Sequence, residues 1–183
     1  MRYRWWICIA VFLLSIGVIS GLAIPSYVAD PVAEDIAALE ELANLLATLP
    51  QFSIFAVIFI KNISTLLLSF VLSPIFCLVP VLALIANGWI IAFVSTEVVQ
   101  QISLGFLLAG LLPHGIFELP ALIMGQAAAL SFGTMAILVL FKRGKVKLLL
   151  PNLRQNLRYL IIAFTLLLPA AIIETYLTPL LLK

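Results

Sequence analysis

Residues 113–121 read Pro-His-Gly-Ile-Phe-Glu-Leu-Pro-Ala and open an apolar run that continues to Phe141. The stretch places an imidazole, His114, and a carboxylate, Glu118, four residues apart between two prolines. Ionisable side chains are costly at membrane depth, so they mark functional sites there. The apolar run itself exceeds the roughly 20 residues that a helix needs to cross a bilayer. We therefore expect the fold to be organised around a membrane helix that starts at this stretch.

The composition supports a membrane protein. The chain has 183 residues, of which 64% are hydrophobic and only 10% charged, whereas soluble domains carry about 25% charged residues. No polar stretch is long enough to fold separately, so residues 1–183 are expected to form a single integral membrane domain. Cys8 and Cys77 lie within apolar runs and predict no disulfide framework.

Five segments are apolar and long enough to span the membrane as helices. They are Trp5 to Ile24, Phe52 to Leu72, Ile75 to Ser95, about Gly115 to Phe141, and Leu157 to about Thr175. Ile102 to Leu112 is too short to cross, so we expect a re-entrant or half-length helix there, covered by protein. The predicted fold class is an all-α, polytopic transmembrane helix bundle with five crossings and this half-length segment.

The distribution of charge predicts the orientation. Eight of the ten Lys and Arg residues fall on two flanks, which hold Arg2 and Arg4, and then Lys142, Arg143, Lys145, Lys147, Arg154 and Arg158. Both flanks should face the cytoplasm, and five crossings place them on the same side. We therefore expect a multi-pass protein of the cytoplasmic membrane, with its N-terminus inside and its C-terminus outside.

The outer loop, residues 25–51, predicts an amphipathic helix. Asp30 can cap a helix that begins at Pro31, and Pro50 would end it. An apolar stripe recurs at helical spacing in Val32, Ile36, Leu39, Ala43 and Leu46. The charged residues of the loop are all acidic: Asp30, Glu34, Asp35, Glu40 and Glu41. Two hypotheses follow, a lid packed on the protein's own helices or a docking surface for an external partner.

Polar residues interrupt the apolar segments at six positions. They are Lys61, Asn62, Asn87, His114, Glu118 and Glu174. The predicted orientation places all six in the outer half of the membrane domain. Lys61 is the only cation at this depth, so we expect it to pair with Glu118 or Glu174 and neutralise two costly charges.

Small residues continue the pattern of the opening stretch at a spacing of four. Ala121, Gly125, Ala129 and Gly133 lie on one helix face below Glu118. Such a groove lets another helix approach closely, and Gly17 and Gly21 give the first segment a similar face. We predict that the fourth membrane helix lies at the centre of the bundle.

The stretch at 113–121 resembles the signature of the stage II sporulation protein M family. Asn62, Asn87-Gly88, and Glu174 to Pro179 are similar to other recurring features of that family, and the likeness covers nearly the whole chain. The resemblance implies a membrane scaffold. In spore-forming bacteria the family member acts in the engulfment machinery and recruits the peptidoglycan-cleaving stage II sporulation proteins D and P. The family also extends into bacteria and archaea that do not sporulate.

Four functional hypotheses follow. The first, implied by the resemblance, is a non-enzymatic scaffold or assembly component of a membrane complex. The second is the membrane subunit of a transporter, whose polar site would resemble those built from broken membrane helices and whose ATPase would be a separate chain. The third is an intramembrane metalloenzyme, and the fourth is lipid binding or scrambling at the polar groups.

The metalloenzyme hypothesis has the weakest sequence support. His114, Glu118 and Glu174 could ligate one metal, but the chain has one histidine and no His-Glu-x-x-His motif. We therefore predict no enzymatic activity, no metal and no cofactor. The expected partners are the lipid bilayer, membrane or extracytoplasmic proteins and further copies of the chain, with no nucleic acid.

Overall fold

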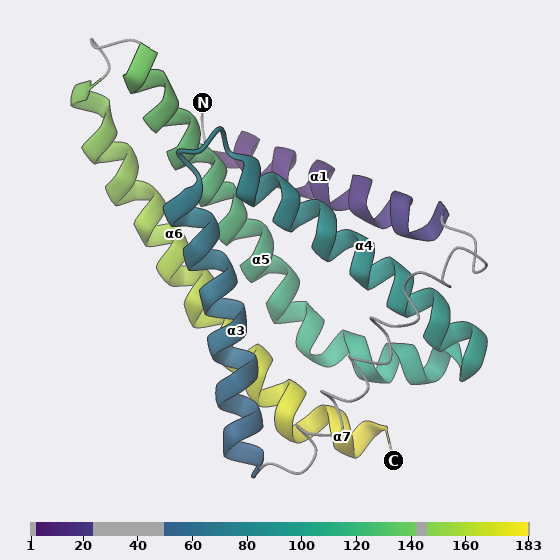
Figure 1. Ribbon diagram of the computed structural model, residues 1–183. Helices are drawn as coiled ribbons and strands as arrows, with labels where there is room; N and C mark the ends of the chain where they lie inside the picture. Colours follow the sequence, from purple (N-terminus) through teal and green to yellow (C-terminus); the bar gives the residue numbers. More distant parts are fainter. Residues whose placement is uncertain (1–2, 24–49, 142–145, 183) are drawn as a thin grey trace.

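The computed structural model describes residues 3–23, 50–141 and 146–182, all of which form helices or short connections between them. The helices are α1 (Tyr3–Ala23), α3 (Gln51–Leu72), α4 (Leu78–Gln101), α5 (Leu104–Phe141), α6 (Val146–Ile172), the π-helix η3 (Ile173–Leu177) and α7 (Thr178–Leu181) (Figure 1). No strand occurs among the described residues. The amphipathic helix predicted between Asp30 and Pro50 lies outside these residues.

Five of the helical segments are long and apolar enough to span a membrane. They are Tyr3–Ala23, Gln51–Leu72, Leu78–Gln101, Leu104–Phe141 and Val146–Leu181. Many large apolar side chains on them are exposed, which suits contact with lipid. The all-α class and the number of long apolar helices predicted from the sequence are therefore confirmed.

The structure differs from the prediction before Pro113. The expected half-length segment and the fourth membrane helix form one helix, α5, which continues through Pro113 and Pro120 and bends in its first half (Figure 1). The break falls earlier, at Ser103, whose hydroxyl accepts a hydrogen bond from the Phe106 N–H at 3.1 Å. Proline removes a backbone bond and bends a helix, but packing against neighbours can keep the helix intact.

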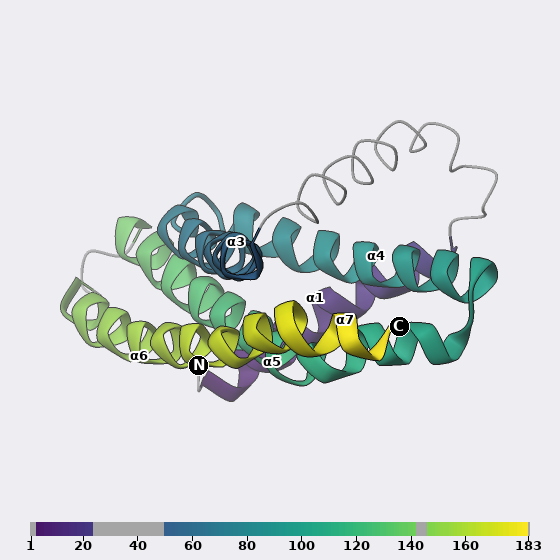
Figure 2. The same ribbon diagram turned by 90° about the horizontal axis from the view of Figure 1, so that it is seen from below.

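The C-terminal segment also begins earlier than predicted. α6 starts at Val146 rather than near Leu157, so it runs beside α5 as a long antiparallel hairpin (Figure 1). Beyond α6 the chain continues through η3 into α7. The C-terminal end of the chain lies beside the first part of α5, where Leu182 contacts Gly110 (Figure 2).

α5 occupies the centre of the bundle and contacts α1, α3, α4 and α6. Its buried face is made of small residues, and the sequence-predicted positions Ala121, Gly125, Ala129 and Gly133 are all buried. A Cβ at Gly125 would meet the side chain of Leu66 at 2.7 Å. Small side chains are what lets helix backbones approach this closely in a membrane.

α1 packs in parallel against α4. Gly17 lies against the backbone of Ile85, and Gly21 lies against Trp89. Across the same contact, a Cβ at Gly88 would collide with the backbone oxygen of Leu14. Two parallel helices can lie side by side only if the connection between them returns across the bundle, and α3 supplies that return (Figure 1).

This contact predicts that Gly88→Ala will destabilise the protein. The added methyl meets backbone rather than a movable side chain, so the unfolding free energy should fall by about 2 kcal/mol, within the range for overpacked cores. The measurement is equilibrium unfolding in mixed detergent micelles. Gly105→Ala is the matched control, since its nearest neighbour is 3.9 Å away. Equal stability of the two variants would contradict the assigned α1–α4 contact.

Candidate functional site

A polar cavity lies where α3 and α4 separate. The two helices meet at their connecting turn, residues 73–77, and then diverge across the face of α5 (Figure 1). The space between them holds two adjoining cavities of about 220 and 340 Å³, which share Lys61, Asn87 and Glu118 in their walls. The sequence predicted that these three side chains would lie near one another, and the fold brings them to one cavity.

Three potential ligands meet in the larger cavity. His114 and Glu118 come from successive turns of α5, and Glu174 comes from the π-helix η3. One ligating atom of each lies within 4.8 Å of the other two. His114 Nε2 is 3.9 Å from Glu118 Oε2, while His114 Nδ1 is buried and has no hydrogen-bond partner. The site thus combines one imidazole with two carboxylates from segments 56 residues apart.

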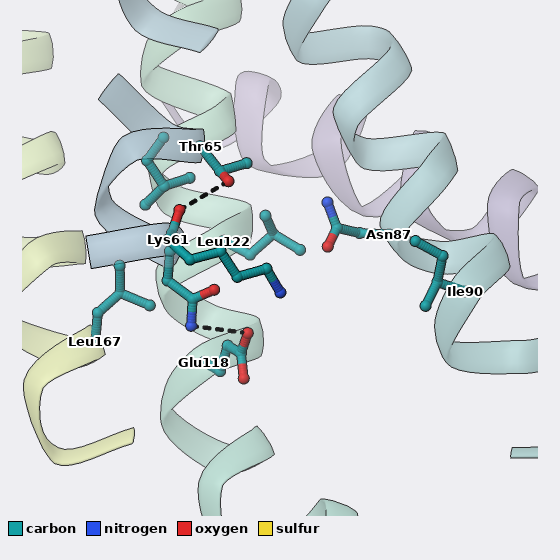
Figure 3. Close-up of a pocket in the computed structure, with 9 residues that line it drawn as sticks. Lys61, Thr65, Asn87, Ile90, Glu118, Leu122 and Leu167 are labelled. Atoms are coloured by element: carbon teal, nitrogen blue, oxygen red, sulfur yellow. Dashed lines mark hydrogen bonds between the residues drawn. The ribbon is translucent and has the colours of Figure 1, made fainter. Parts of the chain in front are cut away.

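Asn62, rather than Lys61, makes the direct contact with Glu118. The Asn62 amide donates a hydrogen bond to Glu118 Oε1 at 3.2 Å, drawn as a dashed line in Figure 3. Lys61 has no carboxylate of Glu118 or Glu174 within 4.0 Å, so the predicted ion pair is wrong. Asn62 therefore supplies the hydrogen bond to Glu118, while Lys61 lines both cavities beside Glu118 without an ion pair to it.

Lys61 and Asn87 line the opening between the diverging helices. Figure 3 shows the Lys61 side chain extending from α3 toward the space in front of Asn87 on α4. Lys61 is exposed, and a long side chain of this kind can cover apolar surface with its stem while its ammonium reaches a polar space. The Asn87 amide donates a hydrogen bond to the Ala83 carbonyl of its own helix at 2.7 Å. Asn87 therefore lines the cavity but makes no hydrogen bond to its charged residues.

The π-helix explains how Glu174 arrives at the site. In this turn the Thr178 N–H bonds Ile173 O, five residues back, and Pro179, which has no N–H to donate, follows directly. Such widened turns occur frequently at functional sites. In this protein the wider turn begins beside Glu174.

Apolar residues close the cavity on the side nearer the α3–α4 turn. Leu66, Leu122 and Leu167 form its apolar wall. Beyond them the core holds alanines of α5 and, as its polar contact, a hydrogen bond from the Gln126 amide to Ser69 Oγ at 3.1 Å. The ionisable groups that line the cavity therefore lie on one side of this packed layer.

A second buried polar cluster escaped the sequence prediction. Asn156 donates to Ser131 Oγ at 3.2 Å and to Asn152 Oδ1 at 3.0 Å, which ties α6 to α5. Asn152 and Asn156 are four residues apart, a spacing that places them on one helix face. The predicted fifth helix began at Leu157 and so excluded both asparagines. A predicted helix that began about one and a half turns earlier in the sequence would have included them.

The charges of the cavity do not balance among the described residues. Glu118 and Glu174 contribute two carboxylates, while Lys61 contributes one ammonium. Together with the His114 imidazole, the cavity therefore holds more potential cation ligands than cationic groups. Cation capture is therefore the chemistry that this arrangement supports.

The Asn62–Glu118 contact leads to a stability prediction. Asn62→Ala should lower the unfolding free energy by about 1 kcal/mol, the usual net value of such a hydrogen bond. Asn87→Ala is the matched control and should stay within a few tenths of a kcal/mol, because Asn87 bonds only its own helix. Detergent unfolding followed by circular dichroism measures both. A larger loss for Asn87→Ala would contradict the assigned contact.

Comparison with known protein families gives one result. The sequence model of the family described as Stage II sporulation protein M matches residues 8–179, nearly the whole chain. Comparisons with curated proteins and with solved structures gave no match. The matched range includes all of α3, α4 and α5 and the cavity between them. The resemblance seen in residues 113–121 thus extends over the membrane bundle, and the chain belongs to the Stage II sporulation protein M family.

Proposed function

We propose that this protein is a non-enzymatic scaffold that assembles other proteins at the membrane. The packed layer beneath the polar cavity is the observation that carries the proposal. Leu66, Phe70, Ala128 and Ala129 are almost fully buried there, and α5 presents small residues that close the space between helices. A single copy is therefore poorly suited to conduct a polar substrate through its middle, whereas a rigid bundle suits the assembly of partners.

In this proposal His114 is not part of a hydrolytic triad. A hydrolytic triad needs a hydroxyl or thiol within hydrogen-bond reach of its histidine. Among the described residues no serine, threonine or cysteine side chain bonds His114. The scaffold accordingly supplies surfaces and geometry and leaves bond cleavage to its partners.

The proposed partners are membrane or extracytoplasmic proteins, together with further copies of the chain. The acidic residues Asp30, Glu34, Asp35, Glu40 and Glu41 would provide the extracytoplasmic contact, since they give that segment a charge that can select a basic partner surface. The exposed apolar side chains of the long helices would contact lipid and other membrane helices.

Retention of a partner tests the scaffold. The full chain, purified from its native membranes in mild detergent, should hold a second protein in a constant ratio, as measured by native mass spectrometry. Replacing Glu34, Asp35 and Glu41 together with glutamine should reduce retention about tenfold, because three surface charge contacts of about 0.5 kcal/mol each are lost. Glu97→Gln is the control. A protein that carries no partner in any constant ratio would rule out a scaffold.

A transporter subunit is the second candidate, and the polar cavity favours it. Ionisable groups gathered between diverging helices resemble the sites of secondary transporters. The same purification separates the two functions. A co-purified ATPase whose hydrolysis falls in Glu118→Gln and Glu174→Gln would support transport, whereas partner retention unaffected by these two variants supports the scaffold.

The proposed orientation is an inside N-terminus and an outside C-terminus in the cytoplasmic membrane. Two observations support it: α1 and α4 pack in parallel, and the described part of the chain holds five long apolar helices, an odd number. Alkaline phosphatase, which folds only outside the cytoplasm, should be active when fused after residue 183 and at least about tenfold less active when fused after residue 144. The reverse pattern of activities would invert the orientation.

A further inference from the structure

We propose that His114, Glu118 and Glu174 bind a divalent first-row transition metal ion such as Zn²⁺. This inference goes beyond the scaffold and does not rest on it. It concerns the larger cavity, where a helix of the central bundle and the π-helix at the chain's end supply ligands to one point. The sequence alone disfavoured a metalloenzyme, but a metal that is bound without hydrolysis requires neither a second histidine nor a catalytic base.

The geometry of the three groups suits such an ion. Ligands about 2.1 Å from a tetrahedral metal lie roughly 3.4 Å from one another. The three atoms here lie within 4.8 Å of each other. Side-chain rotations that move each ligating atom by about 1 Å would bring them to the distances of a bound ion. The His114 Nε2 to Glu118 Oε2 separation of 3.9 Å is already close to that distance.

The surroundings supply independent observations. With Nε2 as the ligand, His114 Nδ1 is the second ring nitrogen, which is buried without a protein partner and would donate to a water. The cavity volume of about 340 Å³ leaves room for an ion and its remaining water ligands. The excess negative charge of Glu118 and Glu174 over Lys61 adds a driving force for a cation.

The ligand set selects the class of metal. An imidazole nitrogen suits Zn²⁺ and its first-row neighbours, whereas Mg²⁺ and Ca²⁺ prefer oxygen ligands throughout. Three protein ligands leave a fourth position of a tetrahedral ion open toward the cavity. Asn62, which donates to Glu118 Oε1, would orient that carboxylate so that its other oxygen faces the ion.

Zn²⁺ titration of the full chain in detergent tests the site. After removal of metal with a chelator, the protein should bind one Zn²⁺ per chain by competition with a fluorescent zinc indicator, and excess Mg²⁺ should not displace it. Glu174→Gln should weaken binding by at least about tenfold, since even outer contacts to metal ligands are worth 10–100-fold. Glu97→Gln is the matched control, because Glu97 lies outside the cavity and accepts a hydrogen bond from Gln101.

Lys61→Met distinguishes a metal site from a merely structural cluster. Removing the ammonium should tighten Zn²⁺ binding about tenfold, because it removes the repulsion between two cations in one small cavity. A misfolded variant would bind more weakly, so the direction of the change is diagnostic. The proposal is overturned if wild-type protein takes up no Zn²⁺ in a one-to-one ratio, if Glu97→Gln weakens binding as much as Glu174→Gln, or if a Lys61→Met variant with the circular dichroism spectrum of the wild type binds more weakly.

Discussion

Close approach of helix backbones is the constraint on which the rest of this structure depends. In lipid, apolar side chains gain nothing from leaving their solvent, so helices associate through van der Waals contact at small residues. α5 supplies such a surface with Gly125 and its neighbouring alanines, and α1 and α4 meet at Gly17 and Gly88. These contacts bring four helices around α5 and hold α3 and α4 together at their turn. The polar cavity exists because the same two helices diverge beyond that turn.

The cavity shows how a membrane protein can hold ionisable groups at modest cost. Glu118 accepts a hydrogen bond from Asn62 and lies beside His114. Glu174 joins them from the other end of the chain. Lys61 lines both cavities, with neither carboxylate within 4.0 Å of its ammonium, and this placement leaves the two carboxylates available to a metal ion. A scaffold could use such a bound cation to hold the end of the chain against α5, because two of the three ligands come from α5 and the third from η3.

Much of the fold could be read from composition and periodicity, because long apolar runs leave few alternatives to membrane helices. The boundaries were less predictable. The stretch at Pro113 suggested the start of the fourth membrane helix, but α5 stays helical through Pro113 and Pro120, and the helix begins after Ser103. The polar residues of the site were identifiable one by one, since each is exceptional in apolar sequence. Their pairing was not, because side chains of neighbouring residues such as Lys61 and Asn62 leave a helix about 100° apart.

The sequence by itself determined the membrane environment, the five apolar helices, the small-residue faces and the family, since each depends on local composition or on a contiguous motif. Only the tertiary structure decided which groups meet. Glu174 reaches His114 because α6 returns along α5 and the π-helix widens the final turn. Among the described residues no carboxylate lies within 4.0 Å of the Lys61 ammonium, and Asn62 bonds Glu118 instead. Contacts between residues far apart in the chain depend on the angles at which helices cross and on the rotation of each helix about its own axis. The local sequence pattern does not specify either quantity.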